Sequence, residues 1–310
     1  MPSPPIQQRS SPVGQGYSLM ASLMRVWQHS YASDYLGLAI LTLALLSLES
    51  FIEPFHRMFS LDILAIQFPH AEIERVPPAW LFVYGGGVPL LVLLLWTTVR
   101  KPQVHKIHVT LLGLFIRYYT FAVVKNAVGR PRPDLIARCK PVQTPAHALV
   151  DFTVCTETNH HVLHDGWRSF PSGHSSFSFA GLGYLALFIA GQLHVFRPRS
   201  DFARALLALT PLVGAALIAI SRCEDYRHDV YDVTCGSLLG FFVALFTYRR
   251  YYPRLRSSKC DVPYRSRSDT GKDGFGKVRD EERGTEDFGS DEQSDDDEER
   301  ERFVLGNVRN

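Results

Sequence analysis

The stretch from residue 221 to residue 232 has side chains whose types and spacing suit nucleophilic chemistry. It reads SRCEDYRHDVYD and contains His228 and, four residues later, Asp232. If a helix begins near His228, this spacing places both side chains on one helical face, one turn apart. A carboxylate there can hold one imidazole nitrogen and leave the other free to attack an electrophile. The alternative is a helix-capping cluster with a solvated histidine.

Two further motifs carry groups suited to an anion. The segment KNAVGRPRPDL contains Lys125 and Arg132, and a phosphate is bound well by a bidentate guanidinium and a point-charge ammonium. The segment FPSGHSS places Ser172, Gly173 and His174 where a helix begins, so backbone N–H groups and the helix dipole favour an anion there. His174 can then give a proton to a leaving oxygen. The alternatives are contact with lipid headgroups for the first motif and simple helix capping for the second.

Six apolar runs must position these motifs. Each is 17 to 21 residues long with few charges, which is enough to cross a bilayer as a helix. The runs are Tyr35–Phe51, Ala79–Val99, Ile107–Val124, Phe177–Leu193, Ala203–Ile220 and Val230–Tyr248. With six spans, the three motifs fall on the same membrane face. We therefore expect an all-α integral membrane bundle of six transmembrane helices, with extracytoplasmic catalytic loops.

Lysine and arginine in the short loops predict the orientation of this bundle. The loops that share a side with the N-terminus carry most of these residues, around positions 100–106, 197–204 and 249–259. Because such loops stay in the cytosol, we expect both termini to be cytosolic and the active site to be lumenal or extracytoplasmic. We expect the protein in an endomembrane, such as that of the vacuole, in preference to the plasma membrane.

The charge is unevenly distributed along the chain. The whole sequence has a net charge of +2, but residues 261–310 carry 16 acidic and 9 basic side chains. We expect residues 1–30, rich in Pro, Ser and Gln, to form a disordered cytosolic lead. Residues 31–259 are predicted to form the membrane domain, and residues 260–310 an acidic, disordered cytosolic tail of unknown partners. Nothing in the sequence indicates a nucleic-acid partner.

The sequence predicts neither a metal site nor a cofactor. No cluster of Asp and Glu suggests a Mg²⁺ site, and no cysteine pair has the close spacing of a zinc knuckle. Cys139 and Cys155 fall in the long extracytoplasmic loop, where oxidation is permitted, and a disulfide or two free thiols would both be consistent with the sequence.

Unusual residues inside three of the apolar runs indicate how the helices pack. Arg117 lies near the middle of the third run, where a charge is costly, so it should face the bundle interior as a structural partner or a substrate contact. The second run contains Gly85–Gly87, which suits close contact or a local kink. The sixth run has Gly236 and Gly240 four residues apart, a small-residue face that allows close packing.

Together the three motifs resemble the signature of the type 2 phosphatidic acid phosphatase superfamily of integral membrane lipid phosphatases. That signature is Lys, six residues, Arg-Pro; then Pro-Ser-Gly-His; then Ser-Arg, five residues, His, three residues, Asp. The matching residues are Lys125, Arg132, Pro133, Pro171–His174, Ser221, Arg222, His228 and Asp232. The similarity extends from about Tyr35 to Tyr248, and fungal diacylglycerol pyrophosphate phosphatases are the most similar subfamily.

The resemblance implies a metal-independent phosphatase for phosphatidic acid, lysophosphatidic acid and diacylglycerol pyrophosphate. In this hypothesis His228, oriented by Asp232, forms a phosphohistidine, and His174 protonates the leaving oxygen. The expected phosphate ligands are Lys125, Arg132, Ser172, Gly173 and Arg222. A phosphatase for polyprenyl pyrophosphates or sphingoid-base phosphates is one alternative, and a non-enzymatic protein that binds or transports lipid phosphates is another. The complete set of two histidines and a carboxylate favours the enzyme, because a binding protein needs no nucleophile.

Overall fold

The computed structural model describes most of the chain between the two terminal segments. The described residues are 31–51, 53–116, 122–142, 148–198 and 200–264. Arg117, the N-terminal lead and the tail beyond residue 264 therefore lie outside the described residues. The chain divides into two units, of which the first is described only over residues 31–37. The second unit, Leu38–Tyr264, contains all three motifs.

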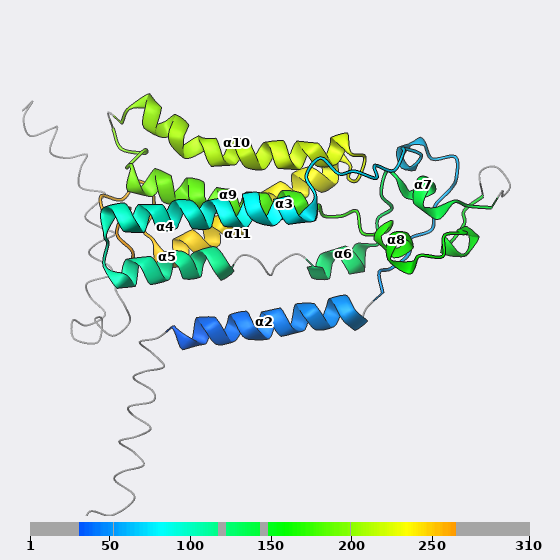
Figure 1. Cartoon of the computed structure of the whole chain (residues 1–310), viewed down its shortest axis with the longest axis horizontal. Coiled ribbons are helices and arrows are strands. Elements are labelled where there is room, and N and C mark those ends of the chain that lie inside the picture. Colours follow the sequence, from blue (N-terminus) through cyan, green and yellow to red (C-terminus); the bar gives the residue numbers. More distant parts are fainter. Residues whose placement is uncertain (1–30, 52, 117–121, 143–147, 199, 265–310) are drawn as a thin grey trace, which may run out of the picture. The chain divides into compact units, whose positions relative to one another are not determined.

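The described residues form helices and loops without a β-strand, apart from two isolated bridges. The long helices are α2 (Ala32–Phe51), α4 (Val88–Arg100), α5 (Val104–Ile116), α9 (Gly173–Gln192), α10 (Phe202–Glu224) and α11 (Val230–Tyr251) (Figure 1). The short ones are η1 (Leu64–Ile66), α3 (Pro78–Phe82), η2 (Val83–Gly87), α6 (Ala122–Val128), α7 (Leu135–Cys139), η4 (Phe152–Val154) and α8 (His160–Asp165). The predicted all-α class is thus confirmed for this part of the chain.

Four helical segments among the described residues are long and apolar enough to cross a membrane. They are the continuous stretch Pro78–Arg100, formed by α3, η2 and α4, and the helices α9, α10 and α11. They correspond to the second, fourth, fifth and sixth predicted spans. The first predicted span is helical as α2, and its apolar described part, Ala32–Ala44, is shorter than a span. The third corresponds to α5 and α6, between which residues 117–121 are not described.

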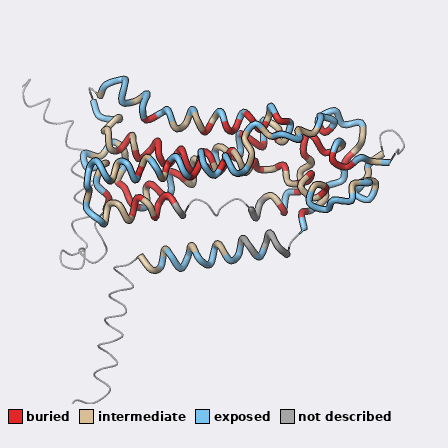
Figure 2. Tube along the Cα trace, in the orientation of Figure 1, coloured by how far each residue is buried: buried red, intermediate tan, exposed pale blue. Residues whose placement is uncertain are grey.

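Helix α9 is the central helix of the second unit. It packs most extensively against α11 and α10, and it also contacts η2, α3 and α4. Its sequence combines Ser, Gly and Ala with apolar residues on every side, and most of its residues are buried (Figure 2). In contrast, α10 leaves apolar side chains such as Leu207 and Leu217 exposed. Exposed apolar side chains on a spanning helix face lipid, whereas a helix that is apolar all round belongs in the interior.

Two glycines on α11 determine how closely it approaches α9. A Cβ atom at Gly236 would lie 2.6 Å from the carbonyl oxygen of Ser172. A Cβ atom at Gly240 would overlap with the carbonyl group of Ser176. The prediction that these glycines form a close-packing face is therefore confirmed. The contact also brings Asp232, one turn before Gly236, to the N-terminus of α9.

The triple glycine in the second candidate span produces a local irregularity in that helix. The segment η2 is a π-helical turn, and its Gly85 lies against α9, where an added Cβ atom would be 2.8 Å from the ring of Phe177. The sequence predicted close contact or a kink at this point, and the structure shows close contact together with a widened turn. Such π-turns widen the helix locally and change which side chains face its neighbours.

A small apolar core organises the loop between α6 and α9. Trp167 is fully buried and packs against Phe59 and Leu135 in this core. A disulfide joins Cys139 to Cys155, which answers the question that the sequence left open. Because Trp167 lies six residues before Gly173, this core positions the chain that leads directly into α9.

The glycine contact between α9 and α11 generates a stability prediction. The variant Gly240→Ala should lower the free energy of unfolding by about 1–3 kcal/mol, because its methyl group must displace backbone atoms of α9. Thermal unfolding of detergent-solubilised protein measures the effect. Gly214→Ala on α10 is the matched control, since its methyl group would lie 3.6 Å from Leu182, an ordinary contact. Equal unfolding midpoints for the two variants would contradict the prediction.

Candidate active site

The three predicted motifs meet where α9 begins, α10 ends and α11 begins. Lys125 of α6 lies against Gly173, because a Cβ atom built on that glycine would be 2.7 Å from the Lys125 Nζ atom. A nitrogen of Arg222, Nη1, lies 3.5 Å from Nε2 of His174. These two contacts join the first motif to the second and the second to the third. The structure therefore brings the three motifs together at one place.

His228 lies in the turn between α10 and α11, two residues before α11 begins. It is only 4% exposed, and its Nδ1 atom lies 3.9 Å from Oδ2 of Asp232, too far for a hydrogen bond. Burial lowers the pKa of His228 to about 4; the Asp232 carboxylate opposes this shift, whereas nearby Arg132 adds to it. The imidazole is therefore neutral at any pH well above 4. A neutral imidazole is the form that can act as a nucleophile.

The carboxylate of Asp232 accepts hydrogen bonds from three groups, none of which is the histidine. Arg130 donates to Oδ1 at 2.6 Å, and the Ser169 hydroxyl donates to Oδ2 at 2.5 Å. The backbone N–H of Asp229, the N-cap residue of α11, donates to Oδ2 at 3.1 Å and completes a capping box. The helix-capping alternative is thus correct for Asp232, and the same bonds fix its carboxylate next to His228.

Ser172 is the N-cap residue of α9, as the capping alternative predicted. Its Oγ atom accepts hydrogen bonds from the backbone N–H and the hydroxyl of Ser175, at 3.4 and 2.9 Å. Its own backbone N–H donates to the Asp232 carbonyl oxygen at 3.0 Å. Because the first N–H groups of a helix have no intrahelical partner, the start of α9 at Gly173 keeps its capacity to hold an anion.

The Nε2 atom of His174 forms a hydrogen bond within the protein. This nitrogen lies 3.1 Å from the carbonyl oxygen of Val76, so it carries the proton of that hydrogen bond. The other ring nitrogen, Nδ1, is the one that can exchange a proton with a ligand while this bond is kept. The adjacent Arg222 disfavours a positive charge on the ring, whereas Glu74, 3.9 Å away, favours it.

Arg132, a predicted phosphate ligand, is paired with Asp165 in this structure. Its Nε atom donates to the Asp165 carbonyl oxygen at 2.8 Å, and Nη2 donates to Oδ1 at 2.9 Å. Arg138 approaches the other carboxylate oxygen at 3.1 Å. Burial alone would raise the pKa of Asp165, but the neighbouring cations, led by Arg132, lower it to about 2. The carboxylate is therefore charged and neutralises part of the cationic cluster.

Arg222, also a predicted phosphate ligand, is only 1% exposed and has two carboxylate partners. Its Nη1 atom donates to Oε2 of Glu74 and its Nη2 atom donates to Oδ2 of Asp225, both at 2.7 Å. Glu74 also pairs through Oε1 with Arg227 at 2.9 Å. Because Glu74 lies in the loop that precedes α3, this loop contributes directly to the site. Glu74 bridges two arginines of the third motif.

Comparison with known proteins decides the family. The PAP2 superfamily profile matches residues 107–256, which include all three motifs. Diacylglycerol pyrophosphate phosphatase 1 of Saccharomyces cerevisiae is 45% identical over 212 residues, covering 65% of this chain and 73% of that protein. Probable diacylglycerol pyrophosphate phosphatase 1 of Schizosaccharomyces pombe is 41% identical over 240 residues, covering 75% and 85%. This chain belongs to the PAP2 superfamily.

This PAP2 protein is also similar to a plant protein. Lipid phosphate phosphatase 2 of Arabidopsis thaliana is 36% identical over 209 residues, covering 65% of this chain and 71% of that protein. No solved structure matches the chain significantly. The resemblance inferred from the motifs is confirmed. Together with the four candidate spans, these relatives support an integral membrane protein.

Several residues at the site of this PAP2 protein were not identified from the sequence. They are Glu74, Arg130, Asp165, Ser169, Asp225 and Arg227. Arg130 and Arg227 lie inside the recognised motifs, so their positive charge was a usable signal. Glu74 and Asp165 come from two other loops, and only the tertiary fold shows that they face the cations.

The Glu74 bridge generates a binding prediction. The variant Glu74→Gln should bind inorganic phosphate about tenfold more tightly, because an anion no longer competes with a carboxylate for Arg222 and Arg227. The glutamine keeps an oxygen that can accept from Arg222, so the fold is preserved. The shift of the thermal unfolding midpoint with phosphate concentration measures this affinity.

Glu72→Gln is the matched control, since Glu72 is exposed in the same loop. It should leave phosphate binding unchanged. Unchanged or weaker binding by Glu74→Gln would show that the carboxylate does not compete with the anion.

Proposed function

We propose that this PAP2 protein hydrolyses the terminal phosphate of lipid phosphates, with diacylglycerol pyrophosphate, phosphatidic acid and lysophosphatidic acid as substrates. The observation that carries the proposal is the neutral, buried His228 with its Nδ1 atom facing Asp232, beside a cluster of cations and the start of α9. A protein that only binds lipid phosphates would need the cations but would not need a buried nucleophile. The names of the yeast and plant relatives support the class of substrate.

In this proposal the phosphate is held by cations and backbone groups in place of a metal ion. The proposed ligands are Lys125, Arg132, Arg222 and the Ser172–Gly173 turn at the start of α9, through the backbone N–H of Gly173, because that of Ser172 donates to the Asp232 carbonyl oxygen. A guanidinium has five N–H groups, so Arg132 and Arg222 can keep a carboxylate partner while they donate to phosphate oxygens. Their positive charge stabilises the equatorial oxygens in the transition state, which makes the reaction independent of metal ions.

The chemical step is a phosphoryl transfer to His228. Its Nδ1–H faces Asp232, which leaves Nε2 to attack phosphorus while the bond from phosphorus to the leaving oxygen breaks. His174 gives a proton to that oxygen, which belongs to the lipid or, in a pyrophosphate substrate, to the remaining phosphate. Bound phosphate favours the protonated form of His174 by supplying nearby negative charge. The oxygen of a water molecule then attacks phosphorus while His174 accepts the water proton, the P–N bond breaks to restore neutral His228, and inorganic phosphate is released.

We further infer the arrangement of this PAP2 protein in the membrane. Six spans, with α2 as the first and α5 with α6 as the third, would place both termini in the cytosol. The site, at the start of α9 and α11, would then face the lumen of an endomembrane compartment. The positive charge of the loops around residues 100–106 and 197–204 supports this orientation. The domain limits proposed from composition, 1–30, 31–259 and 260–310, are consistent with this arrangement.

Phosphate release in detergent micelles tests the proposed reaction. In the presence of EDTA, the wild-type protein should release phosphate from phosphatidic acid and diacylglycerol pyrophosphate. His228→Ala should lower the rate at least about a thousandfold, because nothing else at the site can form the covalent intermediate. Folded wild-type protein that releases phosphate only from polyprenyl or sphingoid substrates would overturn the substrate class. Absence of release from every lipid phosphate would overturn the enzymatic proposal.

A further inference from the structure

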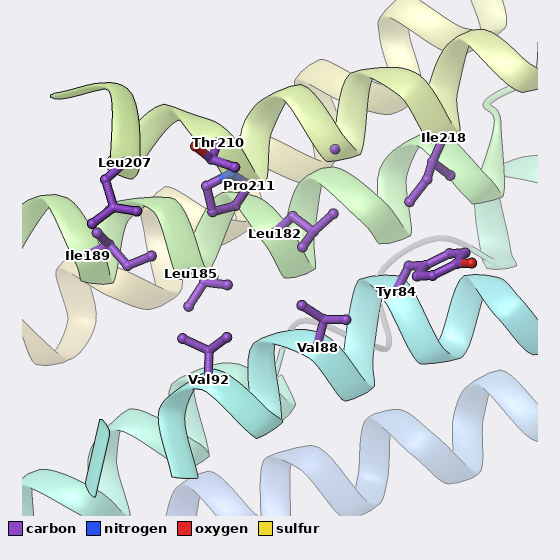
Figure 3. Close-up of a pocket in the computed structure, with 11 residues that line it drawn as sticks. Tyr84, Val88, Val92, Leu182, Leu185, Ile189, Leu207, Thr210, Pro211 and Ile218 are labelled. Carbon is purple, nitrogen blue, oxygen red and sulfur yellow. The ribbon is translucent and has the colours of Figure 1, made fainter. Parts of the chain in front are cut away.

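An apolar groove lies between the helices on the side of α9 that faces α4 and α10. It has a volume of about 530 Å³, within the range of ligand-binding cavities (Figure 3). Tyr84 and Val88 contribute from η2 and α4, Leu182 and Ile189 from α9, and Pro211 from α10. The hydroxyl of the one threonine in its wall is bonded to a backbone carbonyl of its own helix. Its lining is otherwise apolar except for the hydroxyl of Tyr84, so the groove suits a hydrocarbon.

The length of the groove matches one leaflet of a bilayer. Along α10 its lining extends from Leu207 to Ile218, which is about 16 Å at the ~1.5 Å rise per residue of an α-helix. This is about half of the ~30 Å hydrocarbon thickness of a membrane. A single acyl chain of a lipid in one leaflet covers the same depth.

The groove begins close to the phosphate site. Ile218 lies one helical turn, about 6 Å, before Arg222 on the same helix. On the opposite wall, Tyr84 precedes Gly85, which contacts Phe177, one turn after His174. The gap between the groove and the charged residues is the right size for the part of a lipid that links its hydrocarbon chain to its phosphate.

We propose that this groove holds one hydrocarbon chain of the lipid whose terminal phosphate is bound at Arg222 and His174; this inference rests on the proposed function. Lipid tails are as apolar as the groove, so moving a chain from the bilayer into it gains little hydrophobic free energy. The contribution of the groove is orientation. A chain fixed along α9 and α10 aligns the phosphorus with His228, which accelerates hydrolysis of long-chain lipids.

Filling the groove with a side chain tests the proposal. The variant Gly214→Phe is suitable because a Cβ atom at Gly214 would point toward Leu182 at 3.6 Å, without any backbone clash. We expect kcat/KM for dioleoyl phosphatidic acid to fall about tenfold. The value for a water-soluble phosphatidic acid with two four-carbon chains should stay the same. Val213→Phe is the matched control, because Val213 is the exposed neighbour outside the groove, and it should change neither value.

A second variant protects the test against a local folding defect. Val88→Phe fills the groove from the opposite wall and should produce the same selective loss for the long-chain substrate. Equal changes for the two substrates, or no change for the long-chain substrate in either variant, would overturn the groove as a chain-binding site while leaving the proposed reaction intact. A wild-type protein inactive toward both substrates would instead overturn the proposed function, and this inference with it.

Discussion

The close contact between the backbones of α9 and α11 is the constraint on which the site depends. Gly236 and Gly240 leave no room for a side chain, so the carbonyl groups of Ser172 and Ser176 lie directly against α11. The Asp232 carbonyl accepts a hydrogen bond from Ser172 at the same crossing. Two motifs that are more than 45 residues apart in sequence thereby share one helix contact. The cap of α9 and the cap of α11 are stabilised together.

Charge balance is the second requirement of this arrangement. Several arginines lie in or near a largely buried site, and burial of a charge without a partner is costly. Glu74, Asp165 and Asp225 compensate for them, and Arg130 in turn compensates for Asp232. A phosphate entering this cluster meets cations that are already held in place by carboxylates. Its binding therefore requires little reorganisation, but it must compete with those carboxylates.

The sequence predicts several structural features of the candidate site well because they are local. The Ser172 cap, the first turn of α11 that contains Asp232 and the glycine pair each depend on one helix or one turn, and the structure contains all of them. Where the structure describes them, the apolar runs likewise correspond to helices, since length and hydropathy alone define them.

Other features depend on tertiary contacts that no local pattern encodes. Glu74 reaches Arg222 across 148 residues of sequence, so no local spacing pairs the two residues. The 3.9 Å separation of His228 from Asp232 arises because α11 begins only at Val230, so the histidine lies outside the helix whose face was expected to align the pair. The apolar groove requires three helices to leave a gap, which hydropathy does not reveal.

Trapping the phosphoenzyme tests the central claim most directly, because it detects the bond that the proposed nucleophile forms. Wild-type protein quenched during turnover of a substrate with a radiolabelled terminal phosphate should carry label that is stable in base and labile in acid, as a P–N bond is. His228→Ala should carry none, and His161→Ala, which changes an exposed histidine outside the site, should carry as much as wild type. Label that survives in His228→Ala would contradict the assignment of His228 as the nucleophile.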